Sequence, residues 1–173
     1  PPPRARRRDP RAIRADLQAK AQGLPLRWVP VENIHLTLKF LGDIAEANIK
    51  AISDLLQVKA KSIPVFDVKL SGLGVFPNPR KPNVVWVGME APAALFDLQK
   101  QLELDLSSLG FVPEKRPFSP HLTLARVRRE ARPAHLKQIS EVVASTLIAN
   151  AASGRIDTLT LFRSELKPGA SVY

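Results

Sequence analysis

The sequence predicts an α+β domain with two lobes, and three observations favour this class. Segments that alternate apolar and polar residues, as half-buried strands do, are interspersed with segments whose apolar residues recur every three or four positions, as in amphipathic helices. The 173 residues suffice for one sizeable hydrophobic core. A strand carrying His-Leu-Thr-Leu and then a helix occur twice, at 34–61 and 118–148, which indicates a duplicated unit. We therefore expect residues 11–173 to form a single bilobal domain.

The N-terminal residues predict a tail followed by a short helix. Residues 1–10 are rich in Pro and Arg and have almost nothing to bury, so we expect a flexible, solvated segment. Residues 11–21 then show weak helical spacing at Ile13 and Leu17, and Gly23 and Pro25 end the pattern.

The next two elements are a strand and a helix. Alternation over 28–41 predicts a half-buried strand whose apolar side consists of Ile34, Leu36, Leu38 and Phe40. An amphipathic helix is expected from Ala45 to Lys61, with its apolar stripe formed by Ile49, Ile52 and Leu56.

The remainder of the chain continues the alternation of strands and helices. We expect strands at 65–70 and 84–89, joined by a loop that contains Gly72, Gly74, Pro77, Pro79 and Pro82. A helix follows over 93–109, with a buried stripe formed by Leu95, Leu98, Leu102 and Leu106. The last elements are a strand at 118–127, a helix at 134–148 and a strand at 156–162.

Composition narrows the classes of function. The chain has 26 Lys and Arg against 16 Asp and Glu, a net charge of +10, which favours polyanions such as RNA but is equally compatible with a basic protein that has no polyanion partner. The absence of cysteine excludes disulfides and thiolate chemistry. No apolar run approaches a membrane span and no signal peptide is visible, so we expect a cytoplasmic protein without a membrane partner.

The two repeated tetrapeptides carry the candidate chemistry. In a strand, residues i and i+2 share a face, so His35 lies beside Thr37, and His121 lies beside Thr123. One neutral imidazole can take a proton from water while a protonated one gives a proton to a leaving oxygen, which suits phosphodiester cleavage without a metal. Threonine hydroxyls can donate hydrogen bonds to the phosphate oxygens.

Arg126 is a further candidate ligand for a phosphate, because its guanidinium offers paired donors. It lies five residues beyond His121, however, and strict alternation puts it on the opposite face of the strand. The role therefore requires a bulge, a twist or a strand end near Ala125.

Each of these features also has a plainer interpretation. A single His-Leu-Thr-Leu is typical of an ordinary amphipathic strand, but two identical copies among three histidines favour a site. The third, His135, stands near a helix start, where a surface or capping role is the better interpretation. We predict no metal and no cofactor, because the chain lacks His-Glu-x-x-His, cysteine, a Walker-type motif and the third glycine of a dinucleotide site.

At these residues the chain resembles the two-histidine (2H) phosphoesterase superfamily, and within it the RNA 2′,3′-cyclic phosphodiesterases, once named 2′-5′ RNA ligases. The similar blocks occur in the family's order. They are Asn33-Ile34-His35-Leu36-Thr37-Leu38-Lys39-Phe40-Leu41-Gly42, Gly74-Val75-Phe76-Pro77, Val84-Val85-Trp86-Val87-Gly88, Arg116-Pro117-Phe118-Ser119-Pro120-His121-Leu122-Thr123-Leu124-Ala125-Arg126 and Leu161-Phe162-Arg163-Ser164-Glu165-Leu166.

The resemblance implies two pseudo-symmetric antiparallel sheets with flanking helices around a central cleft. It implies metal-independent hydrolysis of RNA 2′,3′-cyclic phosphate ends to 2′-phosphates, with RNA as partner, and reversible 2′-5′ ligation by the same groups. It further implies His35 as general acid and His121 as general base, roles that could be swapped, with Thr37, Thr123 and Arg126 holding the phosphate. We expect a monomer with no obligatory protein partner.

Two other functions are compatible with the sequence, and the chain departs from the family's sequence pattern in two places. The alternatives are an RNA-binding module of the same fold without catalysis, and a 2H enzyme that acts on a small nucleotide. The family usually opens with a strand of the type Arg-x-Phe-x-Ala-Ile, which residues 1–9 do not offer, and it continues into a last strand where this chain stops at Tyr173. The sequence therefore predicts that a central strand and its aromatic residue are missing.

Overall fold

The structure is a computed structural model that describes residues 9–148, 152–163, 165–167 and 170–172. The predicted tail thus falls, over residues 1–8, outside the described residues. The helices in the described residues are α1 (Pro10–Lys20), α2 (Glu46–Ser62), α3 (Ala93–Ser108) and α4 (Pro133–Ser145), with a short 3-10 helix at Val31–Asn33. The strands there are β1 (Leu26–Trp28), β2 (Phe66–Phe76), β3 (Val84–Glu90), β4 (His121–Val127), β5 (Ser153–Ile156), β6 (Glu165–Lys167) and β7 (Ala170–Val172).

The chain divides into two compact units, each assembled from three stretches of sequence. Unit 1 comprises Pro1–Thr37, Asp67–Ala91 and Ser119–Gly154. Unit 2 comprises Leu38–Phe66, Pro92–Phe118 and Arg155–Tyr173. Helices and an antiparallel sheet coexist along the chain, so the predicted α+β class is confirmed.

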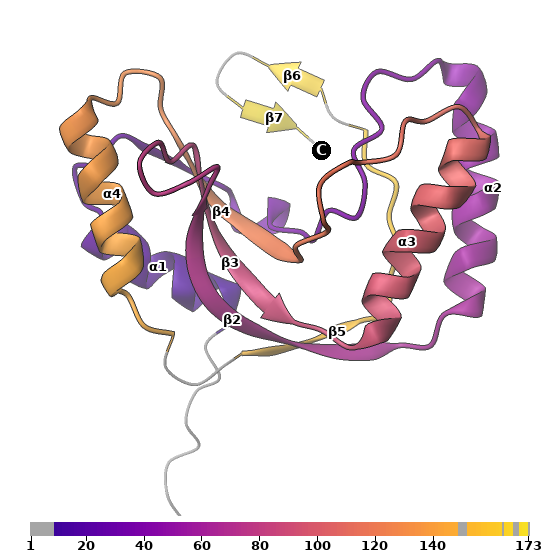
Figure 1. Ribbon diagram of the computed structural model, residues 1–173, viewed down its shortest axis with the longest axis horizontal. Coiled ribbons are helices and arrows are strands. Elements are labelled where there is room, and N and C mark those ends of the chain that lie inside the picture. The colour runs from indigo at the N-terminus through magenta and orange to yellow at the C-terminus, as the bar shows by residue number, and fades with distance from the viewer. Residues whose placement is uncertain (1–8, 149–151, 164, 168–169, 173) are drawn as a thin grey trace, which may run out of the picture. The chain divides into compact units, whose positions relative to one another are not determined.

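The framework of unit 1 is a five-stranded sheet with the order β1-β4-β3-β2-β5. The pairs β1–β4, β4–β3 and β3–β2 are all antiparallel. Helices α1 and α4 cover one face of this sheet (Figure 1), and the core between them contains Ile13 and Leu17 from α1 and Ile139 and Val143 from α4. Each of these side chains contributes about 1.5–3 kcal/mol through burial.

Helix α1 begins where its capping residue permits. The Asp9 side chain accepts a hydrogen bond from the Ala12 amide at 2.9 Å, and Pro10 occupies the first turn, where its missing N–H costs nothing. The predicted helix is therefore confirmed, with its start one residue earlier than expected.

Unit 2 is built around α2 and α3. The predicted leucine stripe of α3 is confirmed, because Leu95, Leu98, Leu102 and Leu106 are all buried. On α2 only Ile52 is buried, and Ile49, which was expected in the stripe, keeps 39% of its surface exposed. The hydrophobic cluster of this unit is formed by Ile52 and three of the α3 leucines.

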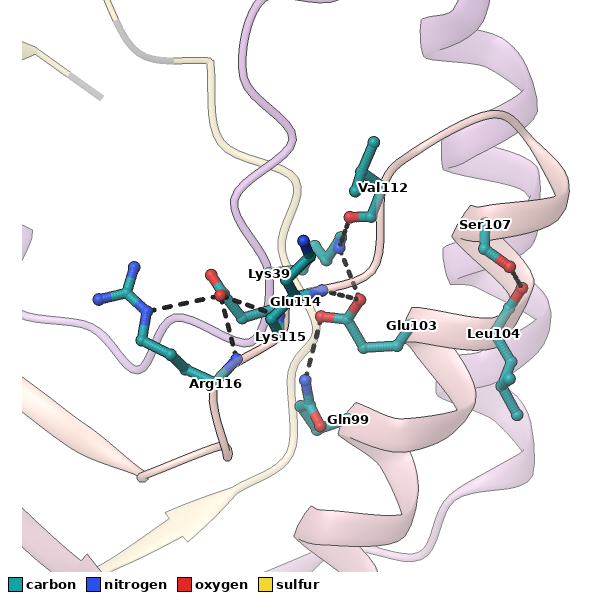
Figure 2. Close-up of polar contacts among 9 residues, drawn as sticks. All are labelled: Lys39, Gln99, Glu103, Leu104, Ser107, Val112, Glu114, Lys115 and Arg116. Carbon is teal, nitrogen blue, oxygen red and sulfur yellow. Dashed lines mark hydrogen bonds and ion pairs between the residues drawn. The ribbon is translucent and has the colours of Figure 1, made fainter.

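A largely buried ion pair fixes the loop after α3 (Figure 2). Lys39 Nζ lies 2.6 Å from Glu103 Oε2 and donates a further hydrogen bond to the Val112 carbonyl at 2.6 Å. The Glu114 amide donates to the same Glu103 carboxylate at 3.1 Å. The Arg116 amide in turn donates to the Glu114 carboxylate and holds the pKa of Glu114 below its ordinary value.

The strands predicted at 28–41 and 156–162 were wrong. Residues 28–41 form no continuous strand: β1 ends at Trp28 and only Leu36 has an isolated bridge beyond it. The reason is that Leu38 and Leu41, three positions apart, pack into the core of unit 2, and Phe40 is 81% exposed. The strand expected at 156–162 is instead β5 at Ser153–Ile156.

The predicted loop is confirmed at Pro77, Pro79 and Pro82, between β2 and β3, but it begins later than expected, because β2 continues through Gly72 and Gly74 to Phe76. A bulge between Leu70 and Leu73 accommodates Gly72, whose φ is +70°. The glycine that was expected to end the strand therefore bends it.

The helices in the described part of the chain are all too short or too polar to span a bilayer.

Candidate active site

The two His-Leu-Thr-Leu motifs meet within unit 1 as neighbours along β4. The second motif begins β4, and Leu36 of the first motif forms an antiparallel bridge with Leu122. Antiparallel register then sets His35 opposite Thr123, and Thr37 opposite His121. Directly opposite residues point to the same side of a sheet, so these four polar side chains share one face.

We call this side the motif face; it is the face of the sheet opposite α1 and α4. Leu124, Ala125, Val85 and Val87 point to the other side, into the core. This register makes His35 and His121 diagonal neighbours, which in an antiparallel pair lie about 7–8 Å apart. Each threonine is the direct neighbour of the other motif's histidine. The sequence did not reveal this pairing, because there the two motifs are only two separate strands.

The bulge that Arg126 required is present in β4. The register with β3 shifts between Val85, which pairs with Ala125, and Trp86, which pairs with Thr123. Leu124 and Ala125 are consequently both directed into the core and fully buried. The shift brings Arg126 to the motif face, where the side chain is exposed.

Both histidines are oriented in the same way by a backbone carbonyl two residues earlier. His35 Nδ1 lies 2.8 Å from the Asn33 oxygen, and His121 Nδ1 lies 2.7 Å from the Ser119 oxygen. A carbonyl oxygen can only accept, so each Nδ1 carries a proton and donates it. In both residues the second ring nitrogen, Nε2, is therefore the one that can take up or release a proton.

Two aromatic residues flank His121 on the motif face. The Phe76 ring meets the His121 ring edge-on with centroids 5.0 Å apart, and the Trp86 ring lies 6.2 Å from His121 and 5.1 Å from Phe76. Gly74 stands opposite Trp86 and leaves space for the indole, since a Cβ on Gly74 would overlap its six-membered ring. These contacts restrict the His121 ring to one orientation.

Sequence reasoning assigned no role to Phe76, Trp86 or Gly74, although it noted the blocks that contain them. The sequence feature that could have identified them is a glycine two residues away from a bulky aromatic residue, which occurs in both of the paired strands. It also missed Arg27, which is exposed on β1 and directly opposite Arg126. The alternation of Leu26, Arg27 and Trp28 already indicated that Arg27 faces away from the core.

The remaining histidine takes the capping role expected of it. His135 Nδ1 accepts a hydrogen bond from the Arg132 amide at 3.2 Å, at the start of α4. Within the described ranges, no group of three or more His, Cys, Asp or Glu side chains is arranged to hold a metal ion. The chemistry that the motif face offers is proton transfer by two imidazoles, with hydroxyl and guanidinium donors for an anion.

The sequence is similar to one family model and to several named proteins. The model described as "LigT like Phosphoesterase" matches residues 1–86 and 87–173, so each match contains one His-Leu-Thr-Leu motif. The RNA 2′,3′-cyclic phosphodiesterase of Methanothermobacter thermautotrophicus is 35% identical over 154 residues, which cover 89% of this chain and 82% of that protein. The protein of the same name from Aquifex aeolicus is 32% identical, over 93% of this chain and 83% of its own length.

Solved structures show the same likeness in three dimensions. A Thermus thermophilus protein superposes with a TM-score of 0.71 at 28% identity, covering 95% of this chain and 88% of that chain. The structure of E. coli LigT complexed with 3′-AMP superposes with a TM-score of 0.65 at 28% identity, covering 94% of this chain and 87% of that chain.

Proposed function

The chain belongs to the LigT-like phosphoesterase family, and from this membership we propose that it is an enzyme that opens the 2′,3′-cyclic phosphate at the end of an RNA to a 2′-phosphate. The relatives named RNA 2′,3′-cyclic phosphodiesterase support this reaction. The structural observation that carries the proposal is the Leu36–Leu122 bridge, because it assembles two histidines and two threonines on one face.

In the proposed reaction, water attacks phosphorus while the bond from phosphorus to the 3′-oxygen breaks. His121 Nε2 takes a proton from the water, and protonated His35 gives its Nε2 proton to the 3′-oxygen. The products are a 2′-phosphomonoester and a 3′-hydroxyl, and water is the only other reactant. With a 5′-hydroxyl in place of water as the nucleophile, the same step breaks the bond to the 3′-oxygen and joins two RNA ends through a 2′-5′ linkage beside a free 3′-hydroxyl.

Thr37 and Thr123 support this chemistry as hydrogen-bond donors to the non-bridging oxygens of the phosphate. The bulge at Leu124 and Ala125 turns Arg126 to the same face, from which its guanidinium can stabilise the negative charge of the transition state. All five residues come from one chain, so we propose the monomer as the active form. Its net charge of +10 suits an RNA partner.

The test is incubation of the purified chain, with chelator and without nucleoside triphosphate, on an RNA that ends in a 2′,3′-cyclic phosphate. We expect a 2′-phosphate product, identified by chromatography. His35→Ala and His121→Ala should each lower the rate by about 10²–10⁴-fold, whereas His135→Ala, the matched control, should retain full activity. Loss of only a few-fold in either motif variant would argue against acid–base catalysis by this pair.

A second substrate separates the two histidine roles. When the 3′-oxygen of the cyclic phosphate is replaced by sulfur, the leaving thiolate needs no proton, because thiols have a pKa of about 8.5. The variant that lacks the general acid should then recover most of its activity, and the variant that lacks the general base should not. We expect recovery for His35→Ala; recovery for His121→Ala instead would reverse the assignment.

The same assay distinguishes the alternatives. RNA binding without any turnover would favour a binding module of this fold. Turnover of a nucleoside 2′,3′-cyclic phosphate but not of an RNA end would favour an enzyme for small nucleotides.

A further inference from the structure

We propose that the RNA upstream of the cyclic phosphate binds to a basic rim at one end of the unit 1 sheet. The basic rim consists of five exposed cations in two loops: Arg80 and Lys81 between β2 and β3, and Arg128, Arg129 and Arg132 between β4 and α4. This inference rests on the proposed function. It defines the substrate as an RNA chain of several nucleotides, whose phosphates contact the rim while the cyclic end lies at the motif face.

The two loops of the rim lie side by side at the same end of the sheet (Figure 1). Antiparallel pairing places the end of β4 beside the start of β3. The Val127 amide donates a hydrogen bond to the Asn83 carbonyl at 2.9 Å, where β4 leads into one loop and the other loop leads into β3. Cations from two distant parts of the sequence therefore gather at one edge of unit 1.

The loop between β2 and β3 is held in a fixed shape. Asn78 Oδ1 accepts hydrogen bonds from the amides of Arg80 and Lys81, at 3.0 and 3.1 Å. The Ser140 hydroxyl of α4 donates a further hydrogen bond to the Pro79 carbonyl at 2.7 Å, which ties the loop to the helix. A backbone that is already ordered loses less conformational entropy when its side chains bind a ligand.

The rim carries more positive charge than its surroundings neutralise. The loops 77–83 and 128–132 contain one acidic residue, Glu130, which lies 3.9 Å from Arg128. Among the described residues, the other four cations of the rim form no ion pair with an acidic side chain. Guanidinium groups bind phosphate oxygens through paired N–H donors, so such a surface is complementary to a polyphosphate chain.

Strand β4 connects the rim to the motif face. Thr123 and Arg128 are five residues apart along the chain, which at about 3.4 Å per strand residue is a rise of roughly 17 Å. A stacked nucleic acid strand advances about 3.4 Å per nucleotide, so about five nucleotides span this distance.

The continuity of the rim with the motif face favours RNA as its partner. An anionic membrane would also be attracted to these cations, but a phosphodiester site at the other end of the same strand would have no use for it. Contacts with phosphates position a nucleic acid without reading its bases. The rim therefore predicts an enzyme that favours longer RNA ends and tolerates any sequence.

The experiment measures kcat/KM on a nucleoside 2′,3′-cyclic phosphate and on a series of longer RNAs that end in the same group. We expect kcat/KM to rise up to about five nucleotides and then to level off. Lys81→Gln, Arg129→Gln and Arg132→Gln, combined in one rim variant, should remove this rise. Three lost phosphate contacts at about fivefold each amount to roughly 10²-fold on a long RNA. On the mononucleotide, which is too short to reach the rim, kcat/KM should stay unchanged.

Two further variants separate the charge of the rim from effects on folding. Arg129→Lys combined with Arg132→Lys keeps the charge and should retain most of the preference for long RNA. Lys50→Gln, Lys61→Gln and Lys100→Gln, combined on the helices of unit 2, form the matched control, because they remove the same charge from exposed side chains. This control should keep the full dependence on chain length.

Direct binding gives a readout that does not require turnover. The dissociation constant is measured for an RNA that ends in the product, a 2′-phosphate, at several salt concentrations. Each phosphate contact of a single strand contributes about 0.7 to the slope of log Kd against log salt. The rim variant should therefore show a slope that is smaller by about 2.

Each failure has its own signature. A kcat/KM that does not depend on chain length, a dependence that the rim variant keeps in full, or an equal loss in the matched control would overturn the proposal. Binding to phosphatidylserine vesicles that the rim variant loses, with RNA binding unchanged, would assign the rim to an anionic membrane and overturn it as well. Absence of turnover on every substrate, with RNA binding still weakened in the rim variant, would overturn the proposed function and leave the rim in place.

Discussion

Replacement of Gly74 by alanine tests whether the aromatic neighbours of His121 matter for catalysis. A Cβ on Gly74 would lie 2.5 Å from Trp86 Cη2 and 2.7 Å from Trp86 Cε2. Ordinary van der Waals contact begins at 3.4 Å, so the indole must retreat by roughly 1 Å. It cannot do so freely, because its ring already packs against Phe76, with centroids 5.1 Å apart, and lies 6.2 Å from the ring of His121.

The expected magnitudes follow from this overlap. Overpacking of a well-filled site costs about 1–3 kcal/mol, which for a chain of this size lowers Tm by about 2–12 °C. The displaced indole moves against Phe76 and His121, and a misplacement of 1 Å at a reacting group can cost about 10²-fold in rate. We therefore expect Gly74→Ala to lose both stability and kcat.

The assays are thermal unfolding and kcat on an RNA that ends in a 2′,3′-cyclic phosphate. Gly154→Ala is the matched control, because the nearest atom to its new Cβ is Val68 Cγ2 at 3.9 Å, an ordinary contact. Gly74→Ala combined with Trp86→Val should be less destabilised than the sum of the single changes, since the clashing ring is gone. If Gly74→Ala were as stable and as active as Gly154→Ala, the packing argument would be refuted.

Three further outcomes are expected. Lys39→Met should destabilise the chain by about 3 kcal/mol in urea unfolding, because it removes the cationic partner of the Glu103 carboxylate, which is only 14% exposed. Lys50→Met should change stability by less than about 1 kcal/mol, since Lys50 is 84% exposed. Equal effects would contradict the role of the Lys39–Glu103 pair. Ile52→Ala should lower the free energy of unfolding by about 2–5 kcal/mol and Ile49→Ala by clearly less, because Ile52 is fully buried and Ile49 is 39% exposed. The same urea unfolding assay checks this order. The pKa of Glu114 lies below its ordinary value of 4.5, so the ionised carboxyl stabilises the fold above that pH. This stabilisation is lost as the pH falls through the lowered pKa. An NMR titration midpoint at or above 4.5 would contradict the hydrogen bond from Arg116.

Much of the secondary structure followed from local patterns. The four leucines of α3 repeat at helical spacing, and they occupy the buried stripe as expected. The start of α1 follows from Asp9 and Pro10, whose effects act within one turn. Such features need no information from distant residues.

The errors arose where the tertiary environment differed from the local pattern. Leu38 and Leu41 are apolar because they pack on the helices of unit 2, and the alternation between them does not reflect a strand. Gly72 and Gly74 indicated a loop, but one bends β2 at a bulge and the other accommodates Trp86. A glycine reports only that a side chain is absent, and the fold decides the reason.

The same distinction between local pattern and tertiary structure applies to the candidate site. The sequence by itself determined which groups are available: two histidines, two threonines and an arginine, in a repeat too regular to be accidental. Only the tertiary structure decided that Leu36 pairs with Leu122, that a bulge turns Arg126 to the motif face, and that Arg27 stands opposite it. Alternation fixes the face of a residue within one strand, but pairing between residues 86 positions apart depends on how the whole chain buries its core.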